Sequence, residues 1–162
     1  MSEKLTAAAK SSALRLLSYR PRSATEIQNR LSDKFDNATV EITMDWLIKD
    51  ELVNDDKFAI WWVESRVRQK LLSSSMIRKE LLEKGVSLSI VNKALINVDD
   101  NLNANQLAER MCRNIGTKDI KEFKQKLYGR LIRRGFSTGV ALSSINNMWN
   151  SRIESNEISL ES

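Results

Sequence analysis

Residues 77–87 read IRKELLEKGVS, and residues 127–137, 50 positions later, read LYGRLIRRGFS with the same apolar spacing and the same glycine turn. An earlier copy of the apolar pair stands at Ile27 and Leu31, again 50 positions before Ile77 and Leu81. Repetition at a fixed period of this size is the signature of tandem structural repeats, in which neighbouring units bury each other's apolar faces. The pattern predicts three related units along the chain.

The repeat continues beyond the glycine turn. Four apolar residues keep the same interval there: Ile90, Leu95, Val140 and Ile145. In the first copy, Ile42 and Leu47 fit this frame only if the turn over 35–39 is longer. Because the register holds across a turn and into the next helix, we expect each unit to contain several helices.

The composition favours helices over strands. One Pro, five Gly and 29% charged residues suit helices, and no sustained Val/Ile/Thr alternation is present. At 162 residues the chain suits one medium domain or a short repeat array. We predict an all-α fold with three-helix repeats at 5–53, 54–101 and 102–151, followed by a polar tail at 152–162 that frays.

Capping residues mark several helix ends. Ser23 and Glu26 have the capping-box spacing, in which the two side chains satisfy backbone N–H groups at a helix start. Gly85 and Gly135 stand where a left-handed residue ends a helix, and each is followed two residues later by a serine that can begin the next. The expected helices cover 5–19, 24–35, 40–52, 56–72, 76–84, 88–97, 102–115, 120–134 and 138–151.

The composition also excludes classes of chemistry. The chain has no His, and Cys112 is the single Cys, so Ser–His and Cys–His nucleophiles and a disulfide framework are impossible. The carboxylate pairs Asp55/Asp56 and Asp99/Asp100 are better explained as helix caps than as a metal or acid–base site. We expect no catalytic residue, no metal and no cofactor.

The expected location is cytoplasmic. The charged start of the chain and the lack of an apolar stretch near 18 residues argue against a signal peptide and a membrane span.

The helix expected at 56–72 has apolar residues on two sides. Trp61 and Trp62 lie on one side, and Ile60 and Val63 on nearly the opposite one. A helix that is apolar on two sides is normally sandwiched between others. The alternative is that one of the tryptophans is exposed as an anchor for a binding partner.

Positive charge gathers toward the C-terminus. The segment from Arg110 to Arg134 contains nine Lys and Arg and two acidic residues. Three of these cations line one flank of the expected helix at 120–134: Lys126, Arg130 and Arg133. The apolar stripe of that helix, Ile120, Phe123, Leu127 and Leu131, is expected to face a core. The flank is either a solvated surface or a site for an anion, which could be DNA or an acidic protein groove.

Several stretches resemble the RecX family of bacterial recombination regulators over roughly residues 10–150. They are residues 20–27 with Leu31, Asp55–Ala59 running into Trp62 and Arg66, Ile77–Leu81 with Lys84-Gly85, and Leu131–Phe136. The chain departs from the family pattern at Glu51, where a small residue or Gly is common, and over 70–75, where a glycine-rich connection is common.

The resemblance implies an elongated, curved array that lodges in the helical groove of a RecA–DNA filament. A non-enzymatic regulator of this kind blocks filament growth or promotes disassembly, which lowers the ATPase, strand-exchange and co-protease activities of RecA. The implied partners are RecA filaments and, weakly and in a salt-dependent way, single- and double-stranded DNA. We expect a monomer that needs no cofactor.

The candidate contacts combine this resemblance with charge position: Arg66, Arg68, Arg78, Lys79, Lys126, Arg130, Arg133 and Arg134. For the group at 66–79, scattered surface charge is the competing explanation. A sequence-independent DNA-binding module of helix-turn-helix-like repeats is the alternative function. A helical scaffold for another protein and, more remotely, a hydrolase also stay open.

Overall fold

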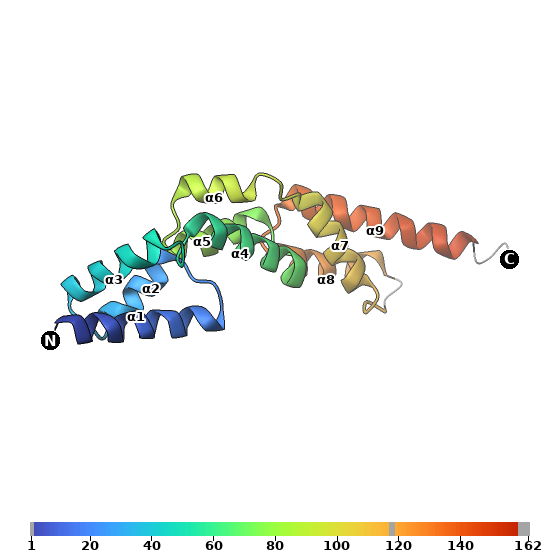
Figure 1. The fold of residues 1–162 in the computed structure, drawn as a ribbon. Helices are drawn as coiled ribbons and strands as arrows, with labels where there is room; N and C mark the ends of the chain where they lie inside the picture. Colours follow the sequence, from blue (N-terminus) through green and yellow to red (C-terminus); the bar gives the residue numbers. More distant parts are fainter. Residues whose placement is uncertain (1, 117–118, 159–162) are drawn as a thin grey trace. The chain divides into compact units, whose positions relative to one another are not determined.

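The computed structural model describes residues 2–116 and 119–158, and these residues form nine α-helices and no strand (Figure 1). The predicted all-α fold is confirmed. In chain order the helices are α1 (Ser2–Tyr19), α2 (Ala24–Ser32), α3 (Asn37–Lys49), α4 (Asp55–Lys70), α5 (Ser74–Glu83), α6 (Leu88–Leu95), α7 (Asp100–Cys112), α8 (Ile120–Arg133) and α9 (Thr138–Ile158).

The helix α3 begins three residues earlier than the predicted start at 40, because Asp36 caps it. The Asp36 carboxylate accepts hydrogen bonds from the backbone N–H of Thr39 at 3.0 Å and from its hydroxyl at 2.9 Å. The first of these bonds satisfies a backbone N–H group that no helical carbonyl can reach. Most other helix ends differ from the prediction by one turn or less.

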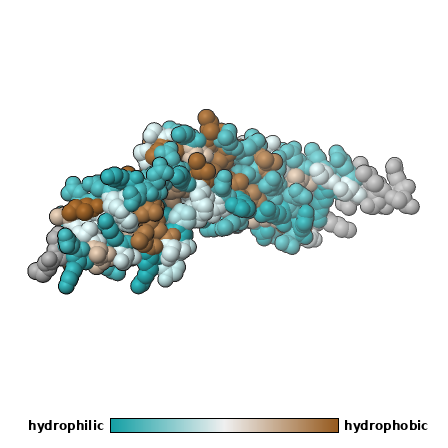
Figure 2. Space-filling model, viewed as in Figure 1, coloured by the Kyte–Doolittle hydropathy of each residue, from teal (hydrophilic) through white to brown (hydrophobic). Residues whose placement is uncertain are grey.

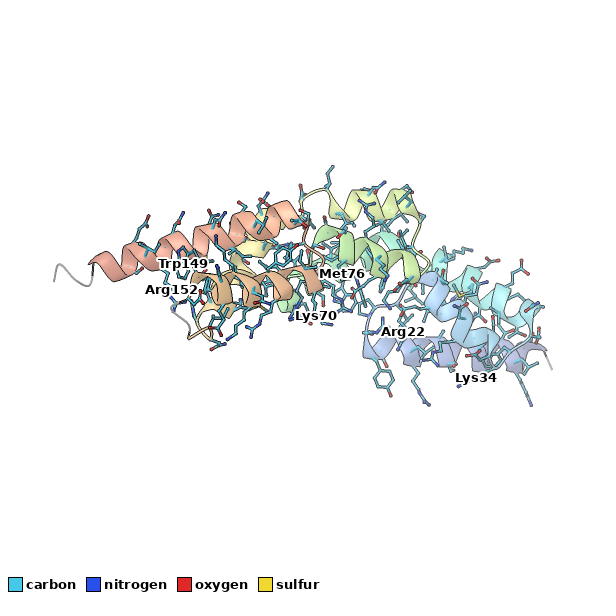
Figure 3. The ribbon with its side chains drawn as sticks, turned by 180° about the vertical axis from the view of Figure 1, so that it is seen from behind. Arg22, Lys34, Lys70, Met76, Trp149 and Arg152 are labelled. Atoms are coloured by element: carbon cyan, nitrogen blue, oxygen red, sulfur yellow. The ribbon has the colours of Figure 1, made fainter. Side chains whose placement is uncertain are left out.

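The end of α9 corrects the expectation of a frayed tail from 152. The helix continues to Ile158, and Arg152 donates a hydrogen bond to the carbonyl of Ile115 at 3.3 Å. Its guanidinium also lies 5.5 Å from the ring centroid of Phe123, which packs against Trp149 (Figure 3). These contacts hold the turn that was expected to fray; residues 159–162 lie outside the described residues.

The chain divides into two compact units. The first contains 2–64 and 78–96, and the second contains 65–77, 97–116 and 119–158. The boundary passes through α4 and α5, so residues of the second predicted repeat occur in both units. The repeat bounds at 5–53, 54–101 and 102–151 stay a prediction.

Each unit has its own apolar core. In the first, α1, α2 and α3 pack around a cluster of buried residues: Ala9, Ala13, Ile27, Leu31, Val40, Met44, Leu47 and Val53. In the second, α7, α8 and α9 pack around Leu71, Ala104, Leu107, Ala108, Ile115, Phe123, Leu127, Leu131, Phe136, Ala141 and Ile145. Burial of these side chains supplies the main favourable term for folding.

The repeated apolar pair is fully buried in all three copies. Six side chains have 0% exposure: Ile27, Leu31, Ile77, Leu81, Leu127 and Leu131. The expectation for Ile42 is wrong, because this residue is 51% exposed, whereas Val40 and Met44 are buried. The early start of α3 at Asn37 changes which of its residues face the core. The turn before α3 is therefore not longer than the corresponding turns before α6 and α9.

The predicted capping box at the start of α2 is present, and it carries a second contact. The Ser23 hydroxyl accepts from the N–H of Glu26 at 3.1 Å, and the Glu26 carboxylate accepts from the N–H of Ser23 at 3.1 Å. The Ser23 hydroxyl also donates to the carbonyl of Lys84 at 2.6 Å. The start of α2 is thus joined to the turn between α5 and α6 in the first unit.

An equivalent junction occurs in the second unit, 50 positions later, where a backbone N–H replaces the Ser23 hydroxyl as donor and Ser75 replaces Thr25, whose hydroxyl donates to the carbonyl of Gly85 at 3.5 Å. The N–H of Ser73 donates to the carbonyl of Arg134 at 3.1 Å, and the Ser75 hydroxyl donates to the carbonyl of Gly135 at 3.0 Å. The start of α5 is thereby joined to the turn between α8 and α9. A shared junction at the repeat interval supports the three-unit prediction independently of the apolar pattern.

Left-handed residues occupy the turns that the sequence marks. Gly85 has φ +76° and Gly135 has φ +88°, which confirms their predicted role at helix ends. Glu51 and Leu71 are non-glycine residues with positive φ, at 54° and 48°. Both lie where the chain departs from the glycine-containing RecX pattern, so these two turns keep a left-handed backbone without a glycine.

Candidate functional site

The basic flank of α8 lies beside its buried stripe. Phe123, Leu127 and Leu131 have no exposed surface, and Lys126, Arg130 and Arg133 follow one another along the adjoining flank, with Arg130 half-buried and the other two exposed. Lys126 forms an ion pair of 2.5 Å with Glu122, one turn earlier. The flank can therefore meet an anion mainly through Arg130 and Arg133, with Lys126 already partly neutralised.

The expectation for Ile120 is wrong. This residue begins the predicted apolar stripe but is 37% exposed. It is the first residue of α8, after Asp119 caps the helix by accepting from the N–H of Lys121 at 2.8 Å. A position at the end of a helix is covered by fewer neighbouring side chains than a position in its middle.

Arg134 has a local structural partner. Its guanidinium donates to the main-chain carbonyl of Lys70 at the end of α4, and its own carbonyl accepts from Ser73. Both bonds hold the connection through the left-handed Leu71. We infer that Arg134 stabilises this junction, and charge reversal there would disturb the fold as well as any surface.

The remaining candidates are divided between the units. Arg68 is exposed and Arg66 is half-buried with a local interaction, and both belong to the second unit with the α8 flank. Arg78 and Lys79 belong to the first unit, where Arg78 donates to the side-chain carbonyl of Asn92 and Lys79 lies 3.9 Å from Glu83.

The whole net charge of the chain falls in the second unit. Residues 1–64 and 78–96 contain thirteen basic and thirteen acidic residues, whereas 65–77 and 97–162 contain thirteen basic and eight acidic residues. Figure 2 shows mainly hydrophilic residues over α7 and α8 on the visible face. The long-range attraction for a polyanion is therefore concentrated in the second unit.

Sequence reasoning missed a second basic flank on α8. Lys121, Lys124 and Tyr128 follow each other at spacings of three and four residues, on the other side of the buried stripe. Among the described residues neither lysine has an ion pair. The three- and four-residue spacing is the sequence signal that predicts this flank.

Trp62 is a core residue and not an exposed anchor. It is 6% exposed, its indole N–H donates to Glu80 at 2.8 Å, and the Lys84 ammonium lies 4.4 Å from the ring centroid. Trp61 is half-buried beside it. The expectation of two buried sides on α4 fails at Ile60, which is 52% exposed.

Glu26 stands at the centre of an ionic cluster in the first unit. Its carboxylate lies 2.7 Å from Arg20 and 3.0 Å from Lys84. Burial raises the pKa of Glu26, but hydrogen bonds from Arg20, Lys84 and the N–H of Ser23 outweigh burial and hold the pKa at about 2. The charged form is therefore strongly favoured in the folded state.

We expect acid to weaken the first unit through this carboxylate. Because the folded pKa of about 2 lies below the ordinary 4.5, the stabilisation is complete above about pH 4.5 and is lost as the pH falls toward 2. Glu26→Gln should lower the free energy of unfolding by about 1–2 kcal/mol at pH 7, after allowance for screening by solvent. Urea unfolding at pH 7 and pH 3 measures both effects.

The matched control is Glu41→Gln, since Glu41 is exposed on α3 and has no ion pair among the described residues. It should leave the pH dependence unchanged. If Glu26→Gln were to keep the full acid sensitivity of the parent chain, the carboxylate would not be the cause.

Three of the four paired carboxylates accept hydrogen bonds at helix starts, as expected, whereas Asp56 forms an ion pair of 3.6 Å with Lys93. Asp55 accepts from the N–H of Ala24 at 2.8 Å, Asp99 accepts from the N–H of Leu102 at 3.0 Å, and Asp100 accepts from both the N–H and the hydroxyl of Ser74. No group of three potential metal ligands occurs within residues 2–116 and 119–158. Within the same ranges, no helix has the length and apolar character needed to span a membrane.

Comparisons with known proteins identify the family. A family model described as "RecX, first three-helix domain" matches residues 9–47, and one described as "RecX, second three-helix domain" matches 54–95. The crystal structure of RecX from Lactobacillus salivarius has a similar fold, with a TM-score of 0.76 and 22% identity over 90% of this chain and 97% of that chain.

Curated relatives agree with this assignment. The regulatory protein RecX of Corynebacterium efficiens is 32% identical over 151 residues, covering 88% of this chain and 72% of that protein. The regulatory protein RecX of Clostridioides difficile is 29% identical over 145 residues, covering 88% of this chain and 68% of that protein. With matched three-helix domains, a shared fold and relatives of this similarity, the chain belongs to the RecX family.

Proposed function

We propose that the chain regulates RecA by binding, chiefly as an inhibitor, in the groove of RecA–DNA filaments. Membership of a family whose curated members are named regulatory proteins carries the proposal. Bound chains would compete with incoming RecA subunits or with a second DNA strand, and would thereby block filament growth or promote disassembly. The ATPase, strand-exchange and co-protease activities of RecA would all fall.

Two structural features support this mechanism. Repeated helical units joined by the same junction suit a partner that is itself a repeating filament. The positive charge of the second unit suits a filament that holds DNA. We further propose that the three repeats stack into an elongated, curved array, which would let one chain reach neighbouring filament subunits.

The basic flank of α8 gives the first test. Reversal of Lys126, Arg130 and Arg133 to Glu should raise the concentration needed for half-inhibition of the RecA ATPase on single-stranded DNA by about tenfold, because three surface ion pairs would become repulsive. Helicity and thermal unfolding should change little, since these side chains lie outside the core.

The control reverses Lys49, Lys57 and Lys93, three exposed lysines of the first unit, and carries the same change in net charge. Only the α8 variant should lose inhibition if the flank is a contact. Equal inhibition by both variants at equal helicity would remove the flank from the site.

The excess charge of the second unit favours one alternative, a sequence-independent DNA-binding module for which RecA is irrelevant. The ATPase assay separates the two functions when it is run at a salt concentration that abolishes binding of the chain to DNA alone. Inhibition that persists there supports filament binding, and inhibition that disappears together with DNA binding supports the alternative.

A further inference from the structure

A groove of about 390 Å³ opens between α1 and the C-terminal end of α2 in the first unit. Its polar lining comes from two segments: Ser11, Ser12 and Arg15 of α1, and Arg30, Asp33 and Lys34 at the end of α2. Because Ser11 and Ser12 have short side chains, they leave room between the two helices. The longer cationic side chains can reach over this space.

Three cations in the groove have no partner within the described part of the chain. Arg15, Arg30 and Lys34 are all exposed, and none of their side chains forms an ion pair or a side-chain hydrogen bond there. Asp33 is the one carboxylate in the lining and is likewise exposed. The groove is therefore a local excess of positive charge in a unit whose total charge is zero.

Helix electrostatics explain only part of this arrangement. Cations at the C-terminal end of a helix offset the partial negative charge of its last carbonyls, which accounts for Arg30 and Lys34. Arg15 comes from a different helix and has no such role.

Arg22 is a further cation of this unit and precedes α2 at the end opposite Lys34 (Figure 3). Burial, followed by the nearby charges of Arg20 and Arg30, lowers the pKa of the Arg22 guanidinium, while Glu26 acts in the opposite direction. The charges of Arg20 and Arg30 thus act on Arg22, and Glu26 offsets part of their effect.

We infer that the α1–α2 groove binds the phosphate backbone of nucleic acid, as a second surface separate from the α8 flank. Two guanidinium groups, an ammonium and two hydroxyls are donors that phosphate oxygens accept, and backbone contacts need charge and donors rather than apolar area. An acidic peptide bound through an interface hot spot would need a pocket for a large apolar or aromatic anchor, and the lining here offers Ala8 and Leu16 as its apolar residues beside six polar or charged ones. This inference stands whether or not RecA is the regulated partner.

Salt-dependent binding of a fluorescent single-stranded oligo-dT to the full chain tests the inference. Lys34→Gln should reduce the slope of log K against log salt by about 0.7 and weaken binding about fivefold at 0.1 M salt, as expected for one lost phosphate contact. Arg15→Gln, on the other helix, should act similarly and gives an independent variant if Lys34→Gln alters the fold. Asp33→Asn should tighten binding, because it removes the one negative charge in the groove.

Lys49→Gln is the matched control, since Lys49 also lies at the C-terminal end of a helix in the first unit but outside the groove. Equal effects of Lys34→Gln and Lys49→Gln would overturn the inference, and so would unchanged or weaker binding by Asp33→Asn. A polyglutamate competitor tests the occupant. If polyglutamate displaces oligo-dT at an equal concentration of charge, and Lys34→Gln abolishes this displacement, the groove recognises acidic protein. The nucleic-acid assignment is then wrong.

Discussion

Leu81→Ala should lower the free energy of unfolding by about 2–5 kcal/mol. Leu81 has no exposed surface, so truncation removes buried methyl groups and leaves a cavity that the surrounding helices fill only in part. Its counterparts Leu31 and Leu131 are equally buried, and the same substitution there should cost a similar amount. Urea unfolding followed by circular dichroism measures the change.

The neighbouring residue supplies the control. Leu82 is 42% exposed on the same helix, so Leu82→Ala should cost well under half as much. Equal stability of Leu81→Ala and the parent chain would mean that the repeated apolar pair does not form part of a core. The repeat frame would then be wrong at its central copy.

Gly85→Ala should be destabilising by about 2–4 kcal/mol, for two separate reasons. The residue has φ +76°, where a side chain costs about 1–2 kcal/mol. A Cβ atom would also lie 2.2 Å from the Thr25 hydroxyl oxygen and 2.5 Å from the Thr25 Cβ, so the start of α2 would have to move. Thermal unfolding compared with the parent chain reports the sum of both effects.

Gly116→Ala is the control, because a Cβ atom at Gly116 would meet nothing within 4 Å and its φ lies outside the left-handed range. It should change stability by no more than about 0.5 kcal/mol. The double variant Gly85→Ala, Thr25→Ala should recover part of the loss, since it removes two of the three atoms in close contact. No recovery would mean that the hydroxyl and methyl group of Thr25 do not cause the loss, which would then come from backbone strain and the remaining contact with the Cβ atom at position 25.

Glycine positions in the sequence predict some of the left-handed residues in the turns and miss others. Gly85 and Gly135 have the left-handed backbone that the sequence predicts, because glycine is the residue that adopts it without cost. Glu51 and Leu71 adopt it as well, and no local feature of the sequence predicts this. Leu71 is 2% exposed, and its burial in the core of the second unit offsets the backbone strain.

The candidate contacts were harder to predict than the core. Lys126 and Arg133 lie where helical spacing places them, on an exposed flank of α8. Arg134 is adjacent in sequence but bonds the end of α4, which no spacing within α8 could reveal. The groove formed by Arg15, Arg30 and Lys34 was missed for the same reason, since it requires two helices to be placed side by side.

The sequence by itself determined the helical class, the 50-residue interval and the buried pair in each copy, because a 3.6-residue period and local capping are properties of neighbouring residues. Only the tertiary structure decided that α9 continues through Arg152, that Glu26 bridges Arg20 and Lys84, and that Trp62 is enclosed. These outcomes depend on side chains far apart in the chain, whose charges and apolar surfaces act on one another only after the helices have packed.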